Sequence, residues 1–207
     1  MTKRILLTGF EPFGGQTVNP SMKVIQHINL QGLSSHTIKI ELLPVVAKKL
    51  YDIIPPLLTE YQPDIIISLG ESGGQTAVNL ERVAVNLLDF GQPDNSGAMI
   101  QDQPIISDGP AAYWSTLPLR QLQTALIHHN IPVMLSLSAG AYMCNQLFYL
   151  CRHWAQQHRP ACLAGFIHLP YLPEQVNNSR SPMASLPLET QIKAITTVIQ
   201  HFEEITT

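Results

Sequence analysis

The residue with the clearest chemical potential in this sequence is Cys144, which follows an apolar stretch that breaks at small residues. The run 131–137 fits a buried strand, residues 138–140 fit a tight turn, and apolar residues recur at helical spacing over 142–154. Cys144 is therefore predicted to lie in the first turn of a helix, where unpaired N–H groups and the helix dipole favour a thiolate. A structural role stays open, because free cysteine is often buried as a small hydrophobe.

A thiol nucleophile needs a base, and the base needs a group that orients it. His168 stands at the carboxyl end of the predicted strand 162–169, the end where open α/β sheets bind ligands. Glu81 interrupts the apolar strand 78–85, and a buried acid needs a hydrogen-bonding partner. The alternative role for His168 is only to cap its strand. The alternative for Glu81 is an ion pair with Arg82, which is weakened because strand alternation places Arg82 on the opposite face. Together the three residues form a complete set of nucleophile, base and orienting acid.

Composition limits the class of protein. The 207 residues are 45% hydrophobic and only 13% charged, against a usual charged fraction of about 25%, so extra buried or subunit-facing surface is expected. A net charge of -3 without a basic stripe argues against nucleic acid and anionic membranes as partners. No apolar run is long enough for a membrane helix, and the first run ends too soon for a signal peptide.

The three cysteines are too few and too widely spaced for a disulfide framework, which predicts reduced thiols and a cytoplasmic location. None of the eight histidines forms a metal-ligand spacing with a cysteine or carboxylate, so no metal site is expected. Nucleophilic catalysis by a thiol with a histidine base requires no organic cofactor.

The order of predicted elements indicates one α/β domain over residues 1–207 with a mostly parallel sheet. Strands are expected at 5–9, 37–43, 65–70, 78–85, 131–137 and 162–169. Helices are expected from Asn19 as N-cap to near Gly32, over 46–61 with a break or bend at Pro55-Pro56, and over 118–130, 142–154 and 188–205. A long polar loop is expected at 170–187.

Four motifs in register resemble the pyroglutamyl-peptidase I family of cysteine peptidases. They are Thr8-Gly9-Phe10-Glu11-Pro12-Phe13-Gly14-Gly15 with Asn19-Pro20-Ser21, the block 70–86 with Glu81-Arg82-Val83-Ala84, Ser138-Ala139-Gly140 with Cys144-Asn145, and Gly165-Phe166-Ile167-His168-Leu169-Pro170. The resemblance runs from about residue 4 to the closing helix.

The resemblance implies a three-layer α/β/α enzyme that removes N-terminal 5-oxoproline from peptides and assembles as a homodimer or homotetramer. Its implied catalytic set is Glu81, Cys144 and His168. Its implied substrate-binding positions are Phe10, Phe13, Asn19, Glu71, Tyr142 and Met143. A role for Asn19 in binding the lactam competes with its role as a helix N-cap, since one side chain seldom does both.

Three positions depart from the usual family pattern. Glu71 stands where glutamine is common, and Gln75 and Gly91 stand where arginines are common. An added carboxylate and two missing guanidinium groups change the charge around the thiol. Two alternatives to a pyroglutamyl peptidase follow: a family member with a different amide substrate, and a weakly active lactam- or peptide-binding protein.

Overall fold

A six-stranded sheet forms the centre of the protein in the computed structural model, which describes residues 2–31, 35–176 and 183–204. Its strands are β1 (Arg4–Phe10), β2 (Thr37–Leu43), β3 (Ile65–Glu71), β4 (Val78–Glu81), β7 (Val133–Ser136) and β8 (Leu163–Leu169). They lie in the order β2-β1-β3-β8-β4-β7, and every neighbouring pair is parallel except β4 and β8. The expectation of a mostly parallel sheet is confirmed.

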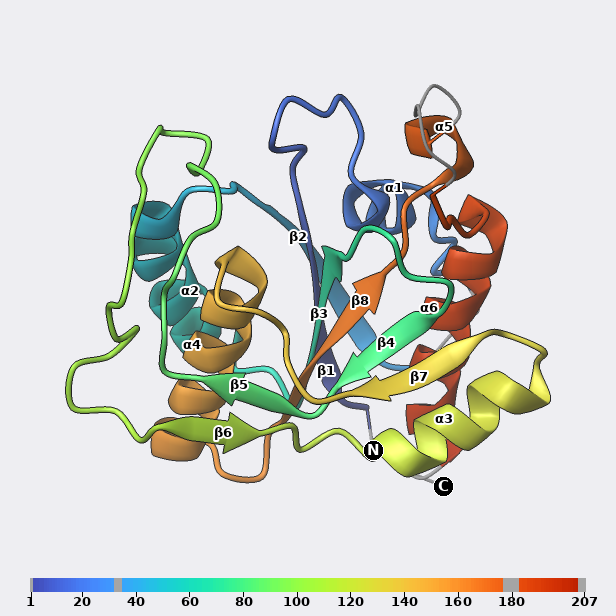
Figure 1. Cartoon of the computed structure of the whole chain (residues 1–207). Coiled ribbons are helices and arrows are strands. Elements are labelled where there is room, and N and C mark those ends of the chain that lie inside the picture. Colours follow the sequence, from blue (N-terminus) through green and yellow to red (C-terminus); the bar gives the residue numbers. More distant parts are fainter. Residues whose placement is uncertain (1, 32–34, 177–182, 205–207) are drawn as a thin grey trace.

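Helices cover both faces of the sheet and give three layers (Figure 1). One face packs against α1 (Pro20–His27), α3 (Leu119–His128) and α6 (Leu188–Glu204), and the other packs against α2 (Ala47–Tyr61) and α4 (Met143–His158). Two apolar cores result, because alternate residues of the central strands enter opposite layers. Among the helices in the described ranges, none has the length and apolarity needed to cross a membrane.

The predicted strand 78–85 is wrong as a single element, because the chain changes sheet at Arg82. The backbone N–H of Arg82 donates to Ser136 of β7, and its carbonyl accepts from Ser115 N–H. After this residue, β5 (Val83–Val85) pairs with β6 (Ala112–Trp114), a strand that was not expected, to form a separate two-stranded sheet. The local residue pattern of 78–85 carries no sign of such a change of partner.

Two helix predictions also need correction. No break occurs at Pro55-Pro56: α2 runs through both prolines, which are exposed, so the backbone groups that they leave unpaired can reach solvent. Helix α1 begins at Pro20 after the N-cap Asn19 but ends at His27, and Gly32 lies outside the described residues.

The predicted loop 170–187 contains the short helix α5 (Pro173–Val176), and residues 177–182 lie outside the described part of the chain.

Candidate active site

Cys144 lies in the first turn of α4 and is half-buried. The side chain of Tyr142, the N-cap residue, makes no capping hydrogen bond, so it does not occupy the first backbone N–H groups of the helix. The Asn145 side chain fixes this helix start by accepting from Val85 N–H at 2.9 Å and donating to the Val85 carbonyl at 2.9 Å. The turn that carries the thiol is therefore held rigidly beside β5.

The backbone of Gly70 in β3 allows the Cys144 thiol to sit directly on the sheet. A Cβ atom built on Gly70 would lie 2.6 Å from Cys144 Sγ and 2.7 Å from Phe166 Cζ, both far below a normal contact. No residue with a side chain fits there without displacing the sulfur or the Phe166 ring. Gly70 pairs with His168 in the parallel register of β3 and β8, so the thiol lies next to β8, the strand that carries the His168 imidazole.

His168 and Glu81 form a buried hydrogen-bonded pair. His168 Nδ1 lies 2.8 Å from Glu81 Oε1, and the residues are 6% and 1% exposed. The antiparallel pairing of β4 with β8 creates this contact, because it places Glu81 opposite Phe166 and diagonal to His168 on the same face. With Nδ1 occupied by the carboxylate, the Nε2 end of the ring is left for the thiol or a substrate.

The charges around His168 favour an imidazolium. Burial by itself lowers the pKa of His168, but the neighbouring Cys144 thiol and the Glu81 carboxylate outweigh it and raise the pKa to about 10. At neutral pH the ring is therefore protonated and able to deliver a proton. By contrast, burial raises the pKa of the Cys151 and Cys162 thiols to about 12, so these cysteines are inert core residues.

Cys144, His168 and Glu81 all line one pocket of about 580 Å³. Of the six expected substrate-binding residues, the structure brings Phe13, Glu71 and Tyr142 to this pocket. The rings of Phe13 and Tyr142 lie 5.9 Å apart, and the Tyr142 hydroxyl donates to the Pro93 carbonyl, so the aromatic wall is fixed. Among the described residues, neither Lys nor Arg lines this pocket.

Glu71 is anchored at the edge of this pocket. Its Oε2 accepts a hydrogen bond from Gln175 Nε2 at 2.7 Å. Burial raises the pKa of Glu71, whereas the Gln175 bond and the charge of His168 act in the opposite direction. The carboxyl group thus lies within electrostatic reach of the imidazole.

Three expected substrate-binding residues, Phe10, Asn19 and Met143, do not line the pocket. Phe10 and Met143 are buried in the core beneath it. Asn19 is 1% exposed, accepts from Ser21 N–H and Oγ–H, and donates to the Glu11 carbonyl, so it acts as the N-cap of α1. Through its bond to the Glu11 carbonyl, Asn19 supports the loop that carries Phe13.

Sequence reasoning missed Gly70 and Asn79 as site residues. Asn79 lines the pocket and lies directly opposite His168 in the β4–β8 register. A signal was present, because Asn79 alternates with Glu81 along an otherwise apolar strand. Within the described ranges, no three His, Cys, Asp or Glu side chains are grouped so that they could hold a metal ion.

The fold and the site together define a class: an α/β protein with the thiol, imidazole and carboxylate arrangement of a cysteine hydrolase. The sequence profile of the family described as pyroglutamyl peptidase matches residues 3–204. The pyrrolidone-carboxylate peptidase of Coprothermobacter proteolyticus is 37% identical over 197 residues, which cover 95% of each chain. That of Bacillus subtilis is 37% identical and covers 99% of this chain and 96% of its own.

Solved structures agree. A mutant pyrrolidone carboxyl peptidase from Pyrococcus furiosus superposes with a TM-score of 0.93 at 36% identity, covering 97% of this chain and 98% of that one. Pyroglutamyl peptidase I from Bacillus amyloliquefaciens gives a TM-score of 0.90 at 38% identity, covering 96% and 95%. The chain belongs to the pyroglutamyl peptidase family and is a cysteine-type omega-peptidase.

Proposed function

We propose that this chain removes an N-terminal pyroglutamyl residue from peptides by a Cys-His-Glu mechanism. Cys144 is the nucleophile, His168 the general acid and base, and Glu81 the group that orients the imidazole. The observation that carries this assignment is one pocket in which a half-buried thiol meets an imidazole bonded to a buried carboxylate at 2.8 Å. Family membership supplies the substrate class.

In the first step the Cys144 thiolate attacks the exocyclic carbonyl carbon of the pyroglutamyl residue. The oxyanion accepts a hydrogen bond from the Cys144 backbone N–H, which points outward from the uncapped start of α4. As the C–N bond breaks, the His168 imidazolium gives its Nε2 proton to the leaving amine. The products are a thioacyl-enzyme and a peptide with a free amino terminus.

In the second step a water molecule attacks the thioacyl carbon while neutral His168 accepts a proton from it. Collapse of the tetrahedral intermediate breaks the C–S bond and releases 5-oxoproline and the Cys144 thiolate. The Glu81 carboxylate keeps the ring in one orientation and stabilises its charged form in both steps.

Selectivity follows from the pocket wall. Phe13 and Tyr142 offer apolar faces to a flat five-membered ring, and the Glu71 carboxylate offers an acceptor for the lactam N–H. A longer open-chain residue would leave buried polar groups of the site unpaired, which is a strong basis for rejection.

Hydrolysis of pyroglutamyl p-nitroanilide by the purified protein tests the proposal, with the Cys144→Ser variant as the matched control. We expect turnover by the wild type and none by the variant above the uncatalysed rate. Equal rates for the two proteins would refute it.

A second candidate keeps the catalytic set but changes the amide that is cleaved. It is favoured by the described part of the pocket lining, which holds the carboxylates of Glu71 and Glu81 and neither Lys nor Arg. N-acetylalanyl and prolyl p-nitroanilides distinguish it: a preference for either over the pyroglutamyl compound would support retuning. If lactam binds without turnover of any anilide, the chain is a weakly active binding protein.

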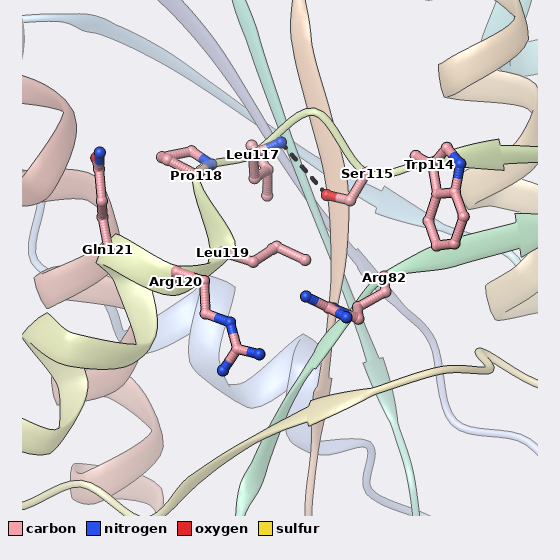
Figure 2. A pocket seen from close by; sticks show the side chains of 8 residues that line it. All are labelled: Arg82, Trp114, Ser115, Leu117, Pro118, Leu119, Arg120 and Gln121. Carbon is pink, nitrogen blue, oxygen red and sulfur yellow. Dashed lines mark hydrogen bonds between the residues drawn. The ribbon is translucent and has the colours of Figure 1, made fainter.

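A homodimer or homotetramer in the cytoplasm is also part of the proposal. Trp114 and Leu137 are 68% and 67% exposed, and Trp114 borders a second hollow of about 430 Å³ (Figure 2). Exposed apolar side chains of this size favour a subunit contact. The three free thiols fit a reducing compartment. Light scattering after size-exclusion chromatography tests the assembly, and a mass of 23.0 kDa, that of one chain, would refute it.

A further inference from the structure

Two buried oxygen atoms in the active-site pocket have no hydrogen-bond donor in the described part of the chain. They are Oε2 of Glu81, the second oxygen of the carboxylate that holds His168, and Oδ1 of Asn79. The two residues are 1% and 7% exposed, so water reaches neither side chain freely. A buried carboxylate oxygen without a donor is costly, and it invites a partner from the nearest polar group.

The strand geometry makes Asn79 and Glu81 neighbours. They are two residues apart on β4, where side chains two positions apart project from the same face. Val78 and Leu80 enter the core beneath α3 and α6, so Asn79 and Glu81 face the layer of α4 and the thiol. Asn79 also lies directly opposite His168, so its amide flanks the imidazole–carboxylate pair.

In the described ranges no Lys or Arg side chain lies in this pocket to pair with Glu81 Oε2. Arg82 follows Glu81 in the sequence, but its guanidinium points to the other hollow, beside Arg120 (Figure 2). The titratable groups that share the pocket with Glu81 are His168 from β8, Cys144 from α4 and Glu71 at the end of β3. The imidazole is bonded to Oε1, Glu71 is bonded to Gln175, and the thiol is the nucleophile.

An amide carries a donor at one end and an acceptor at the other, and a half-turn of the group exchanges them. With Nδ2 directed at Glu81, a single hydrogen bond satisfies Oε2 and turns Oδ1 away from the carboxylate. This one rotation gives Oε2 a donor and removes the opposition between two acceptor oxygens.

We infer that Asn79 is a positioning residue of the catalytic set, whose side-chain N–H donates to Glu81 Oε2 and holds the carboxylate against His168. The inference rests on the proposed roles of Cys144, His168 and Glu81. With both oxygens bonded, the carboxylate has one orientation, and the imidazole is fixed with its free nitrogen toward the thiol. Asn79 acts through Glu81 and does not touch the reacting atoms.

The test compares Asn79→Ser with Asn79→Ala, which differ by a single hydroxyl group able to donate to Glu81. Two quantities are measured: kcat and KM with pyroglutamyl p-nitroanilide, and the pH dependence of Cys144 alkylation by iodoacetamide. For the alanine variant we expect kcat to fall about 10-fold or more, the loss of one hydrogen bond to a charged group, with KM within about twofold. For the serine variant we expect kcat within about threefold of wild type.

The alkylation profile separates positioning from a merely structural role. A carboxylate that is no longer held against His168 stabilises the imidazolium less, and the imidazolium then stabilises the thiolate less. The acid limb should therefore move upward in the alanine variant and stay in place in the serine variant. Identical profiles for the two variants, or an unshifted alanine profile, would overturn the inference. Thermal unfolding by circular dichroism confirms that both variants are folded. Because alkylation needs no turnover, a wild type inactive on pyroglutamyl amides would refute the proposed function and leave this test intact.

Discussion

Substituting Gly70 by alanine tests how closely the thiol is seated on the sheet. The added methyl carbon would lie 2.6 Å from Cys144 Sγ and 2.7 Å from Phe166 Cζ, where an ordinary contact is about 3.5–4.0 Å. Relief requires the sulfur and the Phe166 ring each to move by about 1 Å. A displacement of that size at a reacting atom lowers catalysis by about 100-fold, and overpacking of the core costs about 1–3 kcal/mol of stability.

The assay is kcat for pyroglutamyl p-nitroanilide together with the midpoint of thermal unfolding. Gly91→Ala is the matched control, because it adds the same methyl group to the wall of the same pocket. A Cβ there has no neighbour within 4 Å, and Gly91 is not among the glycines with positive φ. We expect kcat to fall about 100-fold for Gly70→Ala and far less for Gly91→Ala. Wild-type kcat and midpoint in Gly70→Ala would refute the geometric reasoning.

Two further predictions concern ionisation. Iodoacetamide at neutral pH should modify Cys144 alone in the folded protein and all three cysteines after unfolding, because burial raises the pKa of Cys151 and Cys162 to about 12. Mass spectrometry counts the adducts. Rapid labelling of Cys151 in the folded protein would contradict the prediction. Cys144 and Glu81 together outweigh burial and raise the pKa of His168, and Glu81→Gln removes the Glu81 charge, so the imidazolium should be lost at lower pH. The alkaline limb of the kcat profile should shift downward, and kcat should fall about 10–100-fold; an unshifted limb would contradict the assigned pairing.

The change of sheet at Arg82 shows where local pattern stops being informative. Residues 78–85 read as one apolar strand, yet β4 and β5 pair with different partners on either side of Arg82. The partner of β5 is β6, a strand of three residues that begins at Ala112, 27 positions after β5 ends at Val85. Propensity within a window cannot see a hydrogen-bonding partner that lies outside it.

The expected substrate-binding residues show the same limit. Phe13 and Asn19 are close in sequence, but the structure brings only Phe13 to the pocket. Asn19 is fully engaged by Ser21 and the Glu11 carbonyl, as the sequence pattern Asn-Pro-Ser indicates for a helix N-cap. The local sequence pattern predicted the N-cap role that Asn19 has in the structure, whereas its expected role in substrate binding came only from the family resemblance.

By itself the sequence determined the alternation of strands and helices, the mostly parallel sheet, and the three residue types that make up the proposed catalytic set. These features follow from periodicity and from the chemistry of single side chains. Only the tertiary structure decided that Gly70 makes room for the Cys144 sulfur and that Asn79 stands beside His168. The reason is physical: both depend on the register of β8 between parallel β3 and antiparallel β4, and register is fixed by packing between segments that are distant along the chain.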